Sequence, residues 1–284
     1  MQLSVGTPVV TMLPGHHGAW EEAGTIEDVA RIAETADRLG YHHLTCSEHI
    51  GVPASEAGRR GARYWDPLAT FGYLAARTEH IRLATSVLIL GYHHPLEIAK
   101  RYGTLDVLSN GRVVLGVGVG SLQEEFDVLG APFEGRGPRA DDALRALRAS
   151  LSQRVPSYAG EHYSFADLVV DPCAVQPHVP IWVGGRTMRS LRRAVSLADG
   201  WSPFAVGPEL AQQWLADVEL PDAFDVVLGP VAPFDPIEQP EATAQALGDL
   251  AAAGVTIAAA RFVHRSLAHY LEQLEALAAV NRRV

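Results

Sequence analysis

The sequence is poor in cysteine and has no long uninterrupted apolar run. Only two cysteines, Cys46 and Cys173, occur in 284 residues, which excludes a disulfide framework and suits a reducing compartment. The opening segment MQLSVGTPVV lacks a basic leader and a cleavage site, and no apolar run approaches the ~20 residues that cross a bilayer. We therefore expect a cytoplasmic protein with no membrane partner.

Basic residues are also scarce relative to acidic ones. Lys and Arg total 23 against 33 Asp and Glu, a net charge of -10, which argues against nucleic acid or an anionic membrane as the main partner. The 48% hydrophobic content is that of an ordinary globular protein. A chain of this length accommodates a (β/α)8 barrel of about 250 residues as one domain, 1–284.

The segment 81–126 predicts a parallel strand, helix and strand. Ile81–Leu90 and Val113–Val119 are short, apolar and bounded by turn residues, as expected of strands covered on both faces. Between them a helix begins at Pro95 and stops before Asn110-Gly111. Strands joined through a helix run parallel.

The same alternation recurs along the chain and yields eight strand and helix pairs. The other strands are expected at 3–6, 41–46, 181–183, 199–203, 224–228 and 255–262. We predict an irregular segment at 124–137 and a loop or small hairpin, inserted before strand five, at 153–180. The pattern alone permits an open doubly wound sheet or a closed barrel, and both place ligands at the carboxyl ends of the strands.

Glycines at alternate positions end the fourth predicted strand. Gly116, Gly118 and Gly120 withdraw side chains from one face, either to admit a bulky ligand or to permit tight barrel packing. The series is not the GxGxxG dinucleotide fingerprint, because Ser121 follows it and no helix opens at once. A nicotinamide-binding fold is therefore not inferred.

Several motifs follow one another in a family-specific order. They are ATSVL, a His-Pro helix start, LDxLSxGR, LGVGxG, EEF, IWVGG and LADGW, preceded by Ser47-Glu48-His49. In order and spacing they resemble the luciferase-like flavin or deazaflavin oxidoreductases, especially the branch that uses coenzyme F420. The resemblance covers most of the chain. It implies a closed (β/α)8 TIM barrel, a homodimer, and F420 as cofactor, with FMN as the alternative.

The resemblance also assigns residues to the cofactor phosphate. Gly184-Gly185 ends a strand and opens a helix, which suits either a tight turn or an anion held by backbone amides. Family members use the matching glycines for the phosphate, with Arg186 and Thr187 as further donors. The loop Gly118, Gly120 and Ser121 is the other expected contributor.

Two further segments are implied to face the deazaflavin ring. By resemblance, Ser86-Val87 is a non-prolyl cis peptide that forms a bulge behind the ring. Glu48 replaces the family's usual Asp, which is one methylene shorter, in a cofactor contact. His49 lies near the transferring carbon, where an imidazole can give or take a proton; the alternative is a histidine held by neighbouring backbone.

Other polar and aromatic residues are candidates for the substrate side, namely His16, Trp65, Tyr92 and His93. The pairs His16-His17, His42-His43 and His93-His94 invite a metal interpretation, but adjacent strand residues face opposite ways and the chain has no HxH or HExxH. We therefore predict no metal site. Ser121 stands where relatives that oxidise sugar phosphates carry an acid, so that activity is not predicted.

The function predicted from these residues is hydride transfer between F420 and a small organic substrate. The nearest alternative is an FMN-dependent monooxygenase of the same fold, which would need a flavin reductase as partner. Less favoured alternatives are a metal-dependent hydrolase and a barrel that binds a cofactor without catalysis. Neither the substrate nor the direction of hydride transfer follows from the sequence.

Overall fold

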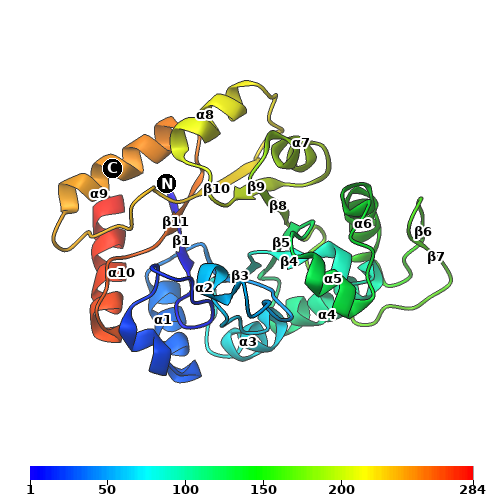
Figure 1. Cartoon of the computed structure of the whole chain (residues 1–284), viewed down its shortest axis with the longest axis horizontal. Coiled ribbons are helices and arrows are strands. Elements are labelled where there is room, and N and C mark those ends of the chain that lie inside the picture. The colour runs from blue at the N-terminus through cyan, green and yellow to red at the C-terminus, as the bar shows by residue number, and fades with distance from the viewer. Residues whose placement is uncertain (284) are drawn as a thin grey trace.

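Short apolar segments form a parallel sheet that closes on itself. The computed structural model describes residues 1–283. Its barrel strands are β1 (Gln2–Gly6), β2 (His43–Cys46), β3 (Arg82–Thr85) with β4 (Leu88–Ile89), β5 (Val113–Gly118), β8 (Ile181–Gly185), β9 (Gly200–Pro203), β10 (Asp225–Leu228) and β11 (Ile257–Ala260). All their pairings are parallel, and the contacts of β1 with β11 and of β3 with β5 close the barrel (Figure 1). The closed (β/α)8 barrel predicted from the sequence is confirmed.

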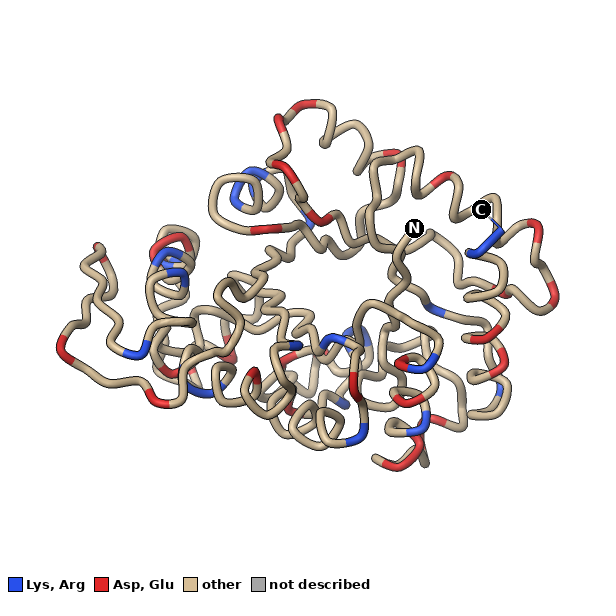
Figure 2. Tube along the Cα trace, turned by 180° about the vertical axis from the view of Figure 1, so that it is seen from behind, with Lys and Arg blue, Asp and Glu red and all other residues tan. Residues whose placement is uncertain are grey.

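Each barrel strand is followed by a principal helix on the outside of the barrel. These helices are α1 (Ile26–Arg38), α3 (Pro67–Ala75), α4 (Pro95–Leu108), α6 (Arg136–Ser150), α7 (Met188–Leu197), α8 (Pro208–Ala216), α9 (Pro240–Ala252) and α10 (Leu267–Asn281). The loops add α2 (Ala57–Arg60), α5 (Gln123–Leu129) and the short 3-10 helices η1 (Ala19–Ala23) and η2 (Leu90–Tyr92). Charged residues lie mainly on these helices and loops (Figure 2). Within residues 1–283 no helix combines the length and the apolar character needed to span a membrane.

Local capping residues explain where several helices begin. The Thr25 side chain accepts from the Asp28 amide and the Asp28 carboxylate from the Thr25 amide, so α1 starts with a capping box. Asp66 caps α3 in front of a proline at the first helical position. In each case the capping residue and the amide that it binds lie within a few residues of one another in the sequence.

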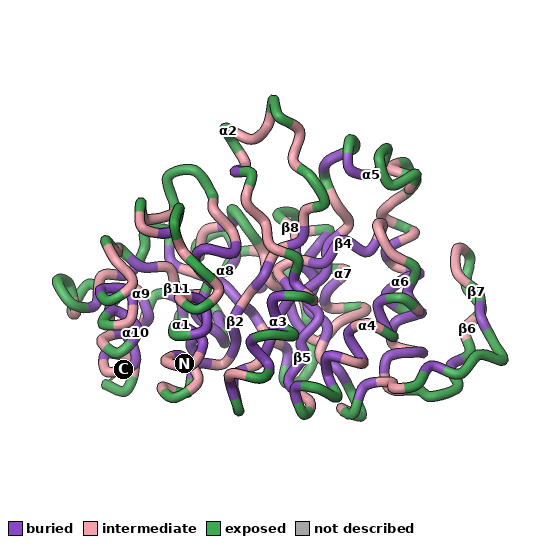
Figure 3. The backbone as a smooth tube through the Cα atoms, turned by 90° about the horizontal axis from the view of Figure 1, so that it is seen from below, coloured by how far each residue is buried: buried purple, intermediate pink, exposed green. Residues whose placement is uncertain are grey.

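The hydrophobic core has two parts. The larger part lies between the barrel wall and the helices, and a smaller cluster fills the barrel interior around Trp182. Figure 3 shows the buried backbone concentrated in the strands and the adjoining helices, while the loop that carries α2 stands out as exposed. The barrel interior is thus a packed core, and ligands of such barrels are expected at the carboxyl ends of the strands.

The third predicted strand is interrupted. Ile81–Leu90 forms β3 and β4, separated by the Ser86-Val87 peptide, which is cis as predicted. This bulge packs closely against glycines of the neighbouring strands. A Cβ on Gly116 would lie 2.0 Å from the Thr85 carbonyl oxygen, and Cβ atoms on Gly118 and Gly184 would lie 2.8 and 2.6 Å from the Val87 methyl groups. Between the two interpretations of the alternating glycines, these contacts favour tight packing.

The prediction of an irregular segment at 124–137 is wrong. Gln123–Leu129 forms α5, and α6 begins at Arg136, inside the segment predicted to be irregular. The helix α5 is short, but the Phe126 ring anchors it by filling the space beside Gly91 and Gly120. Pro138 is accommodated because the first turn of a helix needs no amide donor there.

The predicted insertion before strand five is a hairpin outside the barrel. It consists of β6 (Tyr158–Ala159) and β7 (Ser164–Phe165), which pair antiparallel and project beyond α6 at one edge of the molecule (Figure 1). The Asp142 carboxylate on α6 accepts hydrogen bonds from the Tyr158 hydroxyl and from the His162 and Tyr163 amides. One buried carboxylate therefore anchors the hairpin to the barrel.

A histidine pair lies at the amino-terminal end of the barrel, away from the expected site. His42 lies just before β2, so the two rings need not point to opposite faces as adjacent strand residues do. Nδ1 of His42 lies 2.8 Å from Nδ1 of His43. The His43 ring packs 4.9 Å from Trp182, whose Nε1 donates to Asp225. Burial, with nearby Arg82, lowers the pKa of His42 to about 4, and burial lowers the pKa of His43 well below its ordinary value.

We expect this pair to make the protein sensitive to mild acid. In the unfolded chain both histidines take up protons below about pH 6.5, whereas in the folded chain they stay neutral, so stability falls as the pH decreases. His42 alone should lower the free energy of unfolding by on the order of 1 to 2 kcal/mol between pH 7 and pH 5. Urea unfolding at the two pH values measures the change. His43→Asn should lower stability at pH 7 and make its pH dependence shallower; an unchanged dependence would contradict this origin.

Candidate active site

The loop after β2 is fastened to the interrupted strand beside it. The Ser47 hydroxyl donates to the Ser86 carbonyl at 2.7 Å, and the Glu48 amide donates to the Val87 carbonyl at 3.3 Å. Two consecutive residues of one loop therefore bind the carbonyl of the cis peptide and the carbonyl that follows it. This joins the predicted Ser47-Glu48-His49 and Ser86-Val87 segments at the carboxyl end of the barrel.

Glu48 forms a buried brace. Its Oε2 accepts from the Ile89 amide and its Oε1 pairs with His93 Nε2, both at 2.7 Å. Burial lowers the pKa of His93, but the hydrogen bond and the charge of Glu48 outweigh burial, so the pKa is raised overall. Both Glu48 oxygens are thus bound by protein groups. The glutamate side chain, one methylene longer than the family's usual aspartate, reaches β4 and the His93 ring. The predicted contact of Glu48 with a cofactor stays a prediction.

His49 is oriented by a carboxylate from α5. Its Nδ1 lies 2.9 Å from Glu125 Oε2, which also accepts from the Tyr92 hydroxyl at 2.8 Å. The other oxygen, Oε1, accepts from the Ile50 amide at 2.7 Å and the Gly51 amide at 3.3 Å. The His49 side chain is 20% exposed, its ring packs 4.3 Å from that of Tyr64, and its Nε2 has no hydrogen-bond partner within residues 1–283.

Glu125 is held in its charged form. Burial raises its pKa, but the hydrogen bonds from His49 and Tyr92 outweigh burial and lower it overall. Burial, followed by the hydrogen bond to Glu125 and its charge, raises the pKa of Tyr92, so the Tyr92 hydroxyl remains a donor. Glu125 lies in the EEF motif, and the sequence analysis assigns it no role. The signal that could have identified Glu125 as a site residue is a carboxylate in the first turn of a helix that follows a glycine-rich strand.

The predicted phosphate turn lies between β8 and α7. Gly185 has φ +134°, and a Cβ there would meet the Ser190 side chain at 2.6 Å, so glycine is required. The Thr187 hydroxyl accepts from the Ser190 amide and caps α7, which leaves it occupied locally. Arg186 is exposed, stands 6.0 Å from the Phe204 ring, and has no carboxylate partner in the described chain.

The predicted glycine loop after β5 is placed less favourably for donating to a phosphate. The Phe126 ring fills the space beside Gly120, and the Gly120 carbonyl accepts from Arg136 Nε at 3.1 Å. Ser121 is exposed next to it. Helix α7, by contrast, gathers arginines near its start (Figure 2). The glycine turn, the positive end of α7 and the unpaired Arg186 together fit a phosphate group.

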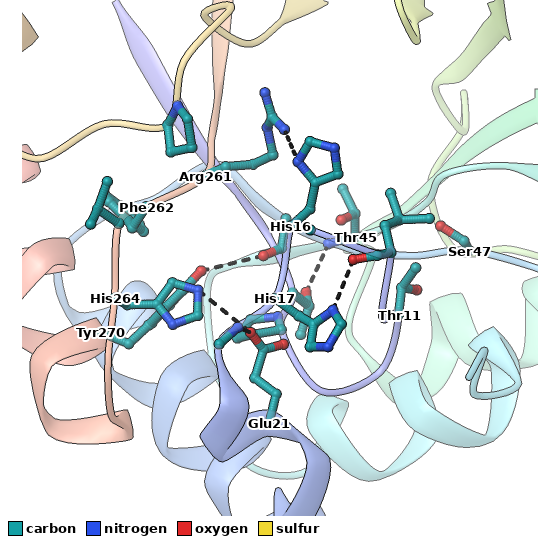
Figure 4. Close-up of a pocket in the computed structure, with 18 residues that line it drawn as sticks. Thr11, His16, His17, Glu21, Thr45, Ser47, Arg261, Phe262, His264 and Tyr270 are labelled. Atoms are coloured by element: carbon teal, nitrogen blue, oxygen red, sulfur yellow. Dashed lines mark hydrogen bonds and ion pairs between the residues drawn. The ribbon is translucent and has the colours of Figure 1, made fainter. Parts of the chain in front are cut away.

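A cavity of about 390 Å³ opens at the ends of β1, β2 and β11 (Figure 4). His16, a predicted substrate-side residue, lines it together with Thr45, Ser47 and Arg261. Tyr92 and His93 instead belong to the carboxylate network described above. Trp65 packs against the hydrophobic core and lines none of the described cavities. Across residues 1–283 no three His, Cys, Asp or Glu side chains are grouped as metal ligands would be.

The fold and the site define a (β/α)8 barrel whose polar groups converge at the carboxyl ends of the strands. Residues 7–228 match the family model of the luciferase-like monooxygenases, and the chain belongs to this family. The family resemblance found in the sequence motifs is confirmed.

The chain is similar to an uncharacterized relative and to two solved structures. An uncharacterized protein of Mycobacterium tuberculosis is 35% identical over 185 residues, which span 61% of this chain and 66%, just under two thirds, of that protein. The coenzyme F420-dependent tetrahydromethanopterin reductase of Methanopyrus kandleri superposes with a TM-score of 0.71 at 16% identity, covering 98% of both chains. The oxygenating constituent of 3,6-diketocamphane monooxygenase from Pseudomonas putida, in complex with FMN, gives 0.70 at 15% identity, covering 98% of this chain and 97% of that one. At such identities the two structures show the shared fold alone.

Proposed function

We propose that this protein transfers a hydride between coenzyme F420 and a small organic substrate. The observation that supports this most is the His49 ring at the barrel mouth, fixed through Nδ1 by Glu125 and unpartnered at Nε2. A histidine held in this way is arranged to exchange a proton at one defined atom. Hydride transfer to or from an organic group leaves a proton to be delivered or removed at the same place.

Each residue around His49 has a definite part in this proposal. Because the Glu125 carboxylate can only accept, it fixes the hydrogen of His49 on Nδ1 and leaves Nε2 to take a proton. The Tyr92 hydroxyl and the Ile50 amide hold that carboxylate in place. Glu125 also stabilises the imidazolium once Nε2 is protonated. His49 is thus the proposed catalytic residue and Glu125 a positioning residue.

The cofactor is proposed to lie between the Val87 bulge and the phosphate turn. When bound, the deazaflavin supplies the carbon that carries the hydride. The start of α7 and Arg186 would hold its phosphate, and Val87 would support the ring from behind. Ser47 and Glu48 keep this segment fixed through the Ser86 and Val87 carbonyls.

A titration of the purified protein with F420 tests the proposal. We expect F420 to bind, and Arg186→Gln to weaken its binding about fivefold to tenfold, since one exposed charge-assisted contact to the phosphate is lost. Arg192→Gln, an exposed arginine farther along α7, serves as the matched control and should change the affinity less than twofold. Absorbance or fluorescence of the cofactor reports binding. The absence of F420 binding would refute the proposal.

An FMN-dependent monooxygenase is the second candidate. The fold is shared with an FMN-bound monooxygenase as closely as with an F420-dependent reductase, and a turn that holds one phosphate does not distinguish the two cofactors. Titration with FMN under the same conditions separates them. Tight binding of FMN without a response to F420, together with substrate oxidation that requires an added flavin reductase, would establish this second function in place of the first.

A further inference from the structure

The cavity shown in Figure 4 has a chemistry that the proposed function does not use. Its volume of about 390 Å³ is at the lower end of the range of about 300 to 1,000 Å³ typical of small-ligand sites. Its wall is formed by the loop after β1, by Thr45 and Ser47 of β2 and its loop, and by residues that follow β11. These elements are far apart in the sequence and are brought together only by closure of the barrel.

Arg261 gives the cavity a positive charge without a counter-ion. Its Nη1 donates to His16 Nδ1 at 3.1 Å, and its Nη2 donates to the Pro230 and Val231 carbonyls at 3.3 Å. No carboxylate forms an ion pair with it in the described chain. Since a guanidinium only donates, His16 Nδ1 must accept, and the His16 ring then carries its hydrogen on Nε2. Arg261 and His16 therefore present donors on the same side of the cavity (Figure 4).

The one acidic group that lines the cavity is already satisfied. Glu21 is 2% exposed, and its two carboxylate oxygens accept from the Val9 and Gly18 amides at 2.8 Å. His264 lies 3.4 Å from the same carboxylate and accepts from Trp20 Nε1 through its own Nδ1. Burial lowers the pKa of His264, so this ring stays uncharged near neutral pH. The charge that a ligand meets is thus that of Arg261.

The deeper wall offers hydroxyl groups. Thr7, Thr11, Thr45 and Ser47 all line the cavity. The Thr11 hydroxyl oxygen is buried from solvent and has no hydrogen-bond partner within residues 1–283. The Ser47 hydroxyl donates to the Ser86 carbonyl, so the cavity reaches the segment against which the cofactor ring is proposed to lie.

We propose that this cavity is the substrate site and that it selects a small organic carboxylate, bound through Arg261 and His16. The planar guanidinium suits the two oxygens of a carboxylate. This inference depends on the proposed function for its link to hydride transfer, because Ser47 connects the cavity to the reacting region. The proposed binding of a carboxylate depends only on the cavity and not on hydride transfer.

Binding of matched acid and amide probes tests the inference without the cofactor. Benzoate and nicotinate are compared with benzamide and nicotinamide, which have nearly the same shape but no charge, by calorimetric or NMR titration of the full chain. We expect each acid to bind at least tenfold more tightly than its amide. Arg261→Gln should abolish this difference, while Arg261→Lys should keep part of it because the charge remains. Arg265→Gln, an exposed neighbour, should leave it unchanged.

Other outcomes would overturn the inference. Equal affinity for acids and amides, no binding of either acid at 20 mM, or equal affinities in wild type and Arg261→Gln would show that the cavity does not select carboxylates. Displacement of benzoate by inorganic phosphate at equal concentration would show an unspecific anion site. F420 binding without carboxylate selection leaves the proposed function standing alone, whereas carboxylate selection without binding of F420 or FMN separates the cavity from that function.

Discussion

His49→Asn is expected to lower kcat by about 10²- to 10⁴-fold, the range found when a general acid or base is removed. Asparagine keeps a donor close to the position of Nδ1, so the contact with Glu125 can persist, but it has no nitrogen that titrates near neutral pH. The affinity for the cofactor should change less than twofold. Turnover with any accepted substrate and a cofactor titration together measure these effects.

Glu125→Gln probes the positioning part of the same arrangement. The new amide must present an NH₂ group either to His49 and Tyr92 or to the Ile50 and Gly51 amides, so one set of donors loses its acceptor. We expect a 10- to 10³-fold loss in kcat and a shifted pH profile. Glu124→Gln, an exposed neighbour in α5, is the control and should retain wild-type activity. If His49→Asn and Glu125→Gln both kept full turnover with unchanged pH profiles, His49 would have no catalytic role.

Gly116→Ala is expected to be the most destabilising single methyl addition in the barrel. The new Cβ would lie 2.0 Å from the Thr85 carbonyl oxygen, which is a backbone atom. The Thr85 hydroxyl also donates to the Gly116 carbonyl at 2.7 Å, so the two segments are held together and neither can move aside cheaply. We expect a loss of about 3 kcal/mol or more, at or beyond the upper end for overpacking. Thermal and urea unfolding measure it. Gly72→Ala on the exposed face of α3, where nothing lies within 4 Å, should instead stabilise by about 0.5 to 1 kcal/mol.

The milder contact at Gly118 gives an internal check on this packing. Gly118→Ala places its methyl group 2.8 Å from a Val87 methyl, and Val87→Ala removes that obstacle. The double variant should therefore lose less stability than the two single variants lose together. Additive losses would mean that Gly118 is needed for a reason other than Val87.

Much of the fold could be predicted because its determinants are local. The apolar strand segments, the capping pair Thr25 and Asp28, and the proline at the start of α4 lie within a few residues of one another. The interrupted strand and the phosphate turn were located through family motifs. The short helix α5 was missed because its formation depends on Phe126 filling space beside glycines from two other segments.

The contacts that give the site its chemistry are long-range and were not predictable from spacing. Glu125 meets His49 across 76 positions, and Arg261 meets His16 across 245. Only closure of the barrel brings these residues together, so neither pair leaves a pattern in the sequence. His49 and His16 were identified as candidates, while the partners that define their protonation and direction were not.

Closure of the barrel also determines where this protein can associate through its backbone. With β3 and β4 counted as one interrupted strand, every principal strand has a neighbour on both sides. The hairpin β6–β7 is the exception among the described residues, since its two strands pair only with each other. Exposed Val155, Leu168 and Val169 flank it. Strand addition by a second chain is therefore confined to this projecting edge, remote from the barrel wall.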